Sequence, residues 1–337
     1  MLPLAITFGE PAGIGPDITL MAWRMRRERD IPPFYLIADP DYVTHRAGRL
    51  GFDVPVASTT TREASANFDR ALPVIPLEAK ATAAPGNPDE SSAPAAIASI
   101  RQAVADILTG RCAAMVTNPV AKSVLYGSGF RDPGHTEFLG KLAKEHTGQA
   151  ARPVMMLWSD ELAVVPITIH LPLKDVPAAL TADSIVNTAR TVTRELIDRF
   201  GIKRPRLALS GLNPHAGEDG ALGREEQTII VPAIKTLEAE RIDVRGPLPA
   251  DTMFHPSARA TYDAALCMYH DQALIPVKML AFDRAVNVTL GLPFVRTSPD
   301  HGTAFDIAGT GRADPSSLIA ALKLAARIAA KTPALAK

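Results

Sequence analysis

The feature that most constrains the fold is the alternation of short apolar runs with amphipathic helical segments. Residues 4–8 form an apolar run, followed by a Gly/Pro-rich turn and then by a helical pattern that begins at Pro16. A closing helical segment begins near Asp314 and Pro315. Two further helical patterns span residues 97–107 and 185–200, and each is followed by a short apolar run, at residues 113–117 and 207–209 respectively. This alternation predicts α/β layers built on a mostly parallel sheet.

Composition limits the class of protein. A chain of 337 residues is long enough for two domains, and 47% hydrophobic with 21% charged residues is typical of a folded globular protein. The basic and acidic residues number 36 each, so no excess positive charge is present to bind nucleic acid. No apolar stretch approaches the roughly 20 residues of a membrane span, and no basic leader precedes the first apolar run.

Two features inside the chain support an intracellular protein with one irregular segment. Cys112 and Cys267 both lie in apolar runs, which predicts buried free thiols in a reducing compartment. Residues 78–94 are rich in Pro, Ala and Ser without periodicity, which predicts a surface excursion inside the first domain. We therefore expect a cytoplasmic protein.

Three histidines follow apolar runs that are predicted strands: His170, His215 and His270. Strand ends are where α/β folds place their sites, and three imidazoles with open coordination positions are typical of a catalytic metal. Their spacing matches no local metal-binding motif, so three structural histidines remain an alternative. Carboxylates nearby, in Glu218 and Asp271, favour a shared metal and acid–base site.

Two further segments indicate nucleotide chemistry. The turn at residues 9–17 contains Gly13-Ile14-Gly15 at a helix start but lacks the third glycine of the dinucleotide fingerprint, which disfavours an ordinary Rossmann site. Residues 300–311 resemble the adenosine-binding loop of isopropylmalate and isocitrate dehydrogenases, in which Gly302, Thr303, Asp306 and Ile307 would contact the cofactor. By that analogy Asp306 would accept hydrogen bonds from the ribose of NAD and repel the extra phosphate of NADP. A loop merely capped by Asp306 is the alternative.

With these segments in view, the sequence resembles the 4-hydroxythreonine-4-phosphate dehydrogenase family over nearly its whole length. The resembling blocks are Gly-Glu-Pro-Ala-Gly-Ile-Gly-Pro from Gly9, Gly-His-Thr-Glu-Phe from Gly134, Thr-Ile-His-Leu-Pro-Leu from Thr168, Gly-Leu-Asn-Pro-His-Ala-Gly-Glu from Gly211, Gly-Pro-Leu-Pro-Ala-Asp-Thr from Gly246, Met-Tyr-His-Asp-Gln from Met268, and Val-Asn-Val-Thr-Leu-Gly-Leu-Pro-Phe-Val-Arg-Thr-Ser from Val286. The resemblance implies a two-domain fold like that of isocitrate and isopropylmalate dehydrogenases, with the active-site cleft between the domains. Residues 1–128 with 284–337 would form the cofactor-binding domain, and 129–283 the substrate, metal and dimerisation domain.

The resemblance also implies residue roles. The metal ligands would be His170, His215 and His270, and the substrate contacts His135, Thr136, Lys278, Asn287 and Arg296. The catalytic group would comprise Asp271, Asp251 and Lys278, with either aspartate as the base, and Lys122 is a secondary candidate for the substrate phosphate. It implies NAD, with NADP as the alternative, one divalent ion (zinc, magnesium or cobalt), and a homodimer in which His170 comes from the partner subunit.

The expected reaction is NAD-dependent oxidation of 4-phosphooxy-L-threonine to 2-amino-3-oxo-4-phosphooxybutanoate, which decarboxylates to 3-amino-2-oxopropyl phosphate in vitamin B6 biosynthesis. Related dehydrogenases acting on phosphorylated threonate or erythronate, or on a cis-dihydrodiol dicarboxylate, are the nearest alternatives. A zinc-dependent hydrolase is an alternative from another class, since three histidines beside a carboxylate also suit activation of water. A non-catalytic metal-binding protein would leave the grouped His, Asp, Lys and Arg without a shared purpose.

Overall fold

A computed structural model describes residues 2–127, 131–132 and 134–332. The chain divides into two compact units: unit 1 comprises Met1–Pro153 and Leu292–Lys337, and unit 2 comprises Val154–Gly291. The expected boundary between residues 128 and 129 lies outside the described residues. Helix α6 (His135–Thr147) belongs to unit 1 because Phe138 and Leu142 pack against the core of that unit, and strand β11 (Val286–Leu290) belongs to unit 2 because it pairs with β6 (Val154–Trp158).

Unit 1 contains a parallel sheet in the order β3-β4-β2-β1-β5-β12. The strands are β1 (Leu4–Thr7), β2 (Phe34–Ala38), β3 (Val56–Ser58), β4 (Leu72–Pro76), β5 (Met115–Val116) and β12 (Arg296–Pro299). The helices are α1 (Gly15–Arg24), α2 (Pro40–Arg49), α3 (Ala64–Asn67), α4 (Ser92–Leu108), α5 (Lys122–Gly127), α6 and α12 (Ser316–Ala329). The central strands are buried on both faces, which explains why they read as continuous apolar runs.

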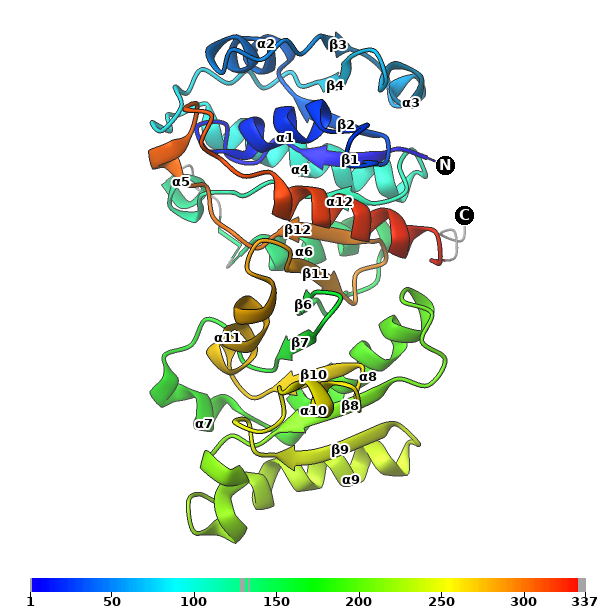
Figure 1. Cartoon of the computed structure of the whole chain (residues 1–337), viewed down its shortest axis with the longest axis vertical. Helices are drawn as coiled ribbons and strands as arrows, with labels where there is room; N and C mark the ends of the chain where they lie inside the picture. Colours follow the sequence, from blue (N-terminus) through cyan, green and yellow to red (C-terminus); the bar gives the residue numbers. More distant parts are fainter. Residues whose placement is uncertain (1, 128–130, 133, 333–337) are drawn as a thin grey trace. The chain divides into compact units, whose positions relative to one another are not determined.

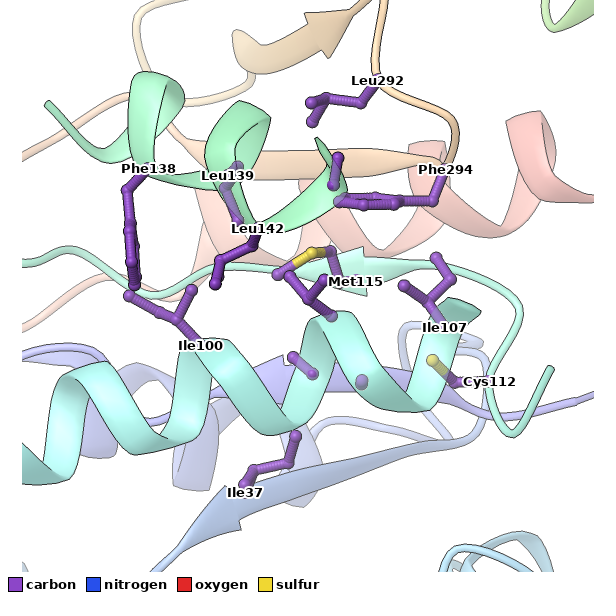
Figure 2. Packing of buried hydrophobic residues seen from close by; sticks show 14 of the residues in the cluster. Ile37, Ile100, Ile107, Cys112, Met115, Phe138, Leu139, Leu142, Leu292 and Phe294 are labelled. Carbon is purple, nitrogen blue, oxygen red and sulfur yellow. The ribbon is translucent and has the colours of Figure 1, made fainter. Parts of the chain in front are cut away.

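Helices cover both faces of this sheet, with α1 and α12 on one side and α4 with α6 on the other (Figure 1). Figure 2 shows Ile100 of α4 directed toward Phe138 and Leu142 of α6, and Ile107 of α4 directed toward Phe294 and toward Met115 of β5. Because residues three or four apart lie on one face of a helix, the predicted helical spacing in 97–107 matches this buried stripe of α4. The packing fixes the start of α6, where two expected substrate residues lie.

Unit 2 contains strands in the order β11-β6-β7-β10-β8-β9, with antiparallel pairing of β6 to β11 and β7 and parallel pairing elsewhere. The remaining strands are β7 (Ala163–Pro166), β8 (Arg206–Ser210), β9 (Asp243–Leu248) and β10 (Ala264–Cys267); the helices are α7 (Val176–Ala179), α8 (Ala182–Asp198), α9 (Val231–Ala239), α10 (Pro256–Arg259) and α11 (His270–Ala281). Helix α8 begins at a capping box formed by Thr181 and Ser184. The predicted α/β class with mostly parallel strands is confirmed.

The local expectations can now be compared with the structure. Strand β10 ends at Cys267, and His270 is the first residue of α11, the helix that follows this strand. The segment 78–94 is not wholly a surface excursion, because Ala83 is buried and α4 already begins at Ser92. Both cysteines are free and buried, as predicted. Among the described residues, no helix is long and apolar enough to cross a membrane.

Candidate functional site

His170 and His270 are brought together by the adjacent parallel strands β7 and β10. Beyond the strand ends the two chains stay joined: the amide of Ile167 donates to the Cys267 carbonyl at 2.8 Å, and the Thr168 hydroxyl donates to the Met268 carbonyl at 2.8 Å. The ring centres of His170 and His270 lie 5.9 Å apart. The expectation that parallel strand ends gather the histidines therefore holds for this pair.

Asp271 orients the His270 ring. Its Oδ1 lies 2.7 Å from Nδ1 of His270, which places the imidazole proton on Nδ1 and leaves the lone pair on Nε2. A cavity of about 230 Å³ lies beside the pair. Its lining residues are Thr168, His170, Leu171, Leu173, Val176, Tyr269, His270 and Asp271. This arrangement is that of a metal-ligating histidine with a carboxylate behind it.

His215 lies in an unusual turn after β8. Five consecutive residues, 215–219, have left-handed backbone angles, and four of them are not glycine. The His215 side chain is exposed. The described residues of one chain contain no group of three or more His, Cys, Asp or Glu side chains that could hold a metal ion. The structure therefore unites two of the three expected ligands, and the third is not joined to them within a single chain.

The donor set fits a divalent ion in part. Two imidazoles bound to one zinc ion at about 2.0–2.1 Å have ring centres roughly 5–6 Å apart, which matches the 5.9 Å between His170 and His270. The carboxylate on Nδ1 of His270 is the outer partner that such ligands usually have. In this pairing both imidazoles come from one chain, whereas the resemblance implies that His170 comes from a partner subunit; that expectation concerns an assembly and stays a prediction.

A second cluster of expected residues lies in unit 1, around Arg296 at the start of β12. Arg296 is 4% exposed, and its Nε and Nη2 donate to the Thr117 hydroxyl at 3.1 and 2.6 Å. Nη2 also lies 3.5 Å from Nδ1 of His135, the first residue of α6. Burial lowers the pKa of Arg296 to about 10, so the group stays cationic at neutral pH.

His135 and its neighbours complete a site suited to an anion. Burial, followed by the nearby charges of Arg296 and Lys122, lowers the pKa of His135 well below its usual range, so its ring is neutral at pH 7. Its Nε2 and the Oδ1 of Asn118 are buried and lack a hydrogen-bond partner within the described residues. Thr136 lies in the first turn of α6, where free amides and the helix dipole favour negative charge.

The sequence argument gave no role to Thr117 or Asn118, although both follow directly after β5. Their signal was the strand end at Val116, the same signal that pointed to the histidines. Lys122 is exposed at the start of α5 and is close enough to act on the pKa of His135. The secondary role considered for Lys122 is thus compatible with its position.

Other expected residues of unit 2 are more dispersed. Lys278 lies on α11 two turns after Asp271, Asn287 lies on β11, and Asp251 is exposed after β9. The described residues that line the cavity beside His170 include Asp271 but none of these three. Their roles stay predictions.

The two expected nucleotide segments lie side by side in unit 1. The amide of Ile14 donates to the Thr303 carbonyl at 2.9 Å, and the amide of Gly309 donates to Oδ2 of Asp17 at 2.6 Å. A Cβ on Gly13 would come within 2.9 Å of the Thr303 carbonyl oxygen, so this close approach requires glycine.

A buried ion pair supports this contact. Arg46 pairs with Asp17 and also donates to the carbonyls of Pro11 and Gly13, at 2.7 and 3.1 Å. Asp306 itself is exposed, in the short turn Phe305–Ile307. Gly302 is exposed, and Thr303 and Ile307 are half-buried in the same loop. The loop is therefore held by residues 9–17 while its acidic side chain remains accessible.

A two-unit α/β fold with paired histidines after its strands and a buried arginine beside His135 suits an enzyme that acts on a small anionic substrate. Residues 30–325 match the family model described as "Pyridoxal phosphate biosynthetic protein PdxA". The chain belongs to this family.

Named relatives agree with the family match. A 4-hydroxythreonine-4-phosphate dehydrogenase from Bradyrhizobium diazoefficiens is 64% identical over 97% of each chain. A crystal structure of 4-hydroxythreonine-4-phosphate dehydrogenase from Klebsiella pneumoniae is 34% identical, with a TM-score of 0.85 over 98% of this chain and 100% of that one. A terephthalate 1,2-cis-dihydrodiol dehydrogenase from Burkholderia xenovorans is more distant, 27% identical with a TM-score of 0.63 over 96% of this chain and 97% of that one.

Proposed function

We propose that this chain is an NAD-linked, metal-dependent 4-hydroxythreonine-4-phosphate dehydrogenase. The observation that carries the proposal is the contact of the buried Arg296 with the half-buried His135 at the start of α6, which provides a fixed cation and a neutral ring donor for a phosphate. A phosphorylated substrate suits this cluster, whereas a substrate without phosphate would leave buried polar groups unmatched. The more distant likeness to the dihydrodiol dehydrogenase agrees with this choice.

The divalent ion would be held by His170, His215 and His270. When bound, it supplies Lewis acidity that lowers the pKa of the substrate hydroxyl. Because one chain does not bring three such ligands together among its described residues, we propose that the set is drawn from two copies of the chain. Asp271 keeps His270 in the tautomer that presents Nε2 as a ligand.

The chain's own groups would carry the proton and orientation steps. Asp271 or Asp251 takes the proton of the C3 hydroxyl while a hydride leaves C3 for the nicotinamide of NAD⁺, giving a β-keto acid. The carboxyl carbon then leaves as carbon dioxide, and the electrons of the broken bond pass toward the new carbonyl. Lys278 and Asn287 would contact the substrate, and Lys278 can share the charge that develops there.

The cofactor would bind at the loop of Gly302, Thr303, Asp306 and Ile307. The exposed Asp306 carboxylate suits the two ribose hydroxyls of NAD and disfavours the phosphate of NADP. The contact of this loop with residues 9–17 fixes it in advance of binding, which reduces the entropy lost when the cofactor is ordered.

We also propose a cytoplasmic homodimer formed through one face of α11 and the segment after His170. Ile275, Met279 and Phe282, spaced four and three residues apart, are 68%, 79% and 80% exposed. Leu173, in the neighbouring segment, is 67% exposed. A grouped apolar surface of this kind is typical of a protein interface. Because α11 begins with His270, an interface here would bring a second chain to the histidines.

The direct test is NADH formation from 4-phosphooxy-L-threonine and NAD⁺ with purified protein and a divalent metal. We expect reduction of the cofactor that depends on metal and is abolished by a chelator. Release of inorganic phosphate without NADH would instead support the hydrolase alternative. Equal or greater turnover with phosphorylated threonate would shift the substrate to that alternative within the family.

A further inference from the structure

The turn that presents His215 is costly in conformation and therefore needs support from elsewhere in the chain. His215, Ala216, Glu218 and Asp219 have φ between 44° and 54°, a region that L-residues rarely occupy in succession. Each such residue is disfavoured relative to the right-handed region, because the left-handed conformation brings its Cβ close to the following carbonyl oxygen. A run of this kind persists only where surrounding contacts impose it.

Glu226 supplies those contacts. Its Oε1 accepts hydrogen bonds from the amides of Leu212 and Asn213, both at 2.8 Å, and its Oε2 accepts one from the Asn213 side-chain amide at 2.9 Å. These are the two residues just before Pro214 and His215. The carboxylate is 3% exposed, so it is shielded from water and its bonds are correspondingly strong.

The same carboxylate contacts the middle of the turn. A Cβ on Gly217 would lie 2.6 Å from Oε2 of Glu226, so only glycine fits between this carboxylate and the left-handed run. Glu226 is also the first residue of a single π-helical turn (Glu226–Ile230), a feature frequently found at functional sites. Glu226 therefore holds the turn both before His215 and two residues after it.

Gln272 holds Gly211, the residue directly before Leu212, through a separate set of hydrogen bonds. Its Nε2 donates to the Gly211 carbonyl at 2.8 Å, and its Oε1 accepts from Ser210 and from the amide of Met268, both at 2.7 Å. This side chain belongs to α11, two residues after His270. The segment leading to His215 is thus fixed to α11 by Gln272 and to the π-helical turn Glu226–Ile230 by Glu226.

We propose that Glu226 is a positioning residue for His215: it imposes the left-handed turn that presents this imidazole for metal binding. The inference rests on the proposed function, because it assigns Glu226 a role through one of the proposed ligands. Glu226 itself does not touch metal or substrate in this account. Its loss would release the turn and leave His215 in many orientations, which lowers metal affinity without removing a ligand.

The test uses the full-length protein stripped of metal, with variants Glu226→Ala and Glu226→Gln. Cobalt(II) affinity is measured by calorimetric titration, and backbone hydrogen exchange is followed in residues 211–223. We expect Glu226→Ala to weaken cobalt binding by roughly 10- to 100-fold, the usual effect of losing an outer partner of a ligand. Exchange in 211–223 should accelerate. Glu226→Gln, which keeps an oxygen acceptor for the two backbone amides, should restore most of both properties.

Glu195→Gln is the matched control. Glu195, on α8, is also a buried residue of unit 2, 5% exposed, and its Oε2 lies 2.9 Å from Nε of Arg199 at the C-terminal end of that helix. This variant should lower the melting temperature while leaving cobalt affinity and exchange in 211–223 as in the wild type. A loss of affinity that merely followed stability in both variants would overturn the positioning role.

The two proposals fail in different ways. If His215→Ala binds cobalt as tightly as the wild type, the proposed ligand set is wrong. Hydrogen exchange of residues 211–223 in Glu226→Ala would still test whether Glu226 holds the turn. If His215→Ala loses cobalt binding but Glu226→Ala keeps full affinity and wild-type exchange, the ligand set stands and the role of Glu226 is overturned. Should Glu226→Ala not fold, unchanged affinity in Glu226→Asp, whose shorter side chain withdraws the carboxylate, would overturn it equally.

Discussion

The two candidate sites of this chain are built in opposite ways. In unit 1, Arg296 is buried and His135 is half-buried, and Arg296 is bonded to Thr117, so the anion site exists before any ligand arrives. In unit 2, His170 and His215 are exposed and lie on left-handed backbone, and the described residues of one chain do not bring three ligands together. In the proposed enzyme, phosphate recognition would therefore be preorganised by burial, whereas metal binding would depend on backbone strain and on a second chain.

The largest effect is expected from His215→Ala, which deletes a proposed ligand on the strained turn. Turnover should be abolished, and cobalt affinity should fall by more than the roughly 100-fold that an outer partner is worth. Unfolding should change little, because the side chain is exposed. Cobalt titration and thermal denaturation measure these two properties. Full activity of the variant in metal-stripped buffer would contradict His215 as a metal ligand and with it the contrast between the two units.

The double variant Met279→Glu with Phe282→Glu tests whether a second chain completes unit 2. We expect a monomer by analytical ultracentrifugation and loss of tight cobalt binding, because charges replace the exposed apolar face of α11. Ile197→Glu, at another exposed apolar position of unit 2, should remain dimeric. A monomeric variant that still binds cobalt like the wild type would contradict ligands drawn from two chains.

Arg296→Lys tests the prebuilt site of unit 1. Lysine keeps the charge but lacks the planar fork that contacts Thr117 and faces His135. We expect kcat/KM for the phosphorylated substrate to decrease roughly 100-fold, about 2.7 kcal/mol of transition-state stabilisation. Metal affinity should stay unchanged. Steady-state kinetics measures kcat/KM, and cobalt titration measures the metal affinity. A loss of cobalt affinity as large as the loss of kcat/KM would contradict separate roles of the two units in phosphate recognition and metal binding.

A smaller effect is expected from Asp306→Ala. Losing the proposed acceptor for the ribose hydroxyls should raise the KM for NAD by roughly tenfold, about 1.4 kcal/mol. The selectivity for NAD over NADP should decrease. The KM for the substrate should hardly change. Kinetics with both cofactors checks this, and an unaltered KM for NAD would remove Asp306 from the cofactor site.

The smallest effect concerns the pH dependence of stability. Burial and neighbouring cations depress the pKa of His135 in the folded state, so the unfolded chain binds its proton more readily. The free energy of unfolding should therefore decrease as the pH falls below the ordinary histidine pKa of about 6.5, with a slope approaching about 1.4 kcal/mol per pH unit. His135→Asn should flatten this slope in chemical denaturation. An identical slope in both proteins would contradict a neutral His135.

The sequence predicted those parts of the fold and sites that follow from local patterns. Apolar runs identified the strands, and because parallel strands β7 and β10 end side by side, His170 and His270 could be expected to meet. The family resemblance added Arg296 and His135 to the expected site. In the structure, Nη2 of Arg296 lies 3.5 Å from Nδ1 of His135.

Other features depend on contacts between distant residues and could not be predicted. The left-handed run after Pro214 has no signature beyond Gly217, since its stability comes from Glu226 further along the chain. Thr117 has the appearance of an ordinary strand-end residue until Arg296 is placed against it. The sequence also could not predict that only two of the three histidines lie together in one chain, because the spacing of residues does not tell which chain supplies a ligand.

The central claim is that imidazoles of His170, His215 and His270 bind one divalent ion. X-ray absorption spectroscopy of the cobalt-loaded protein, with His215→Ala alongside, tests it most directly. The account predicts imidazole scattering from three nitrogen ligands at roughly 2.0–2.1 Å in the wild type and one fewer in the variant. A first shell of oxygen alone, or the same imidazole count in both proteins, would contradict it.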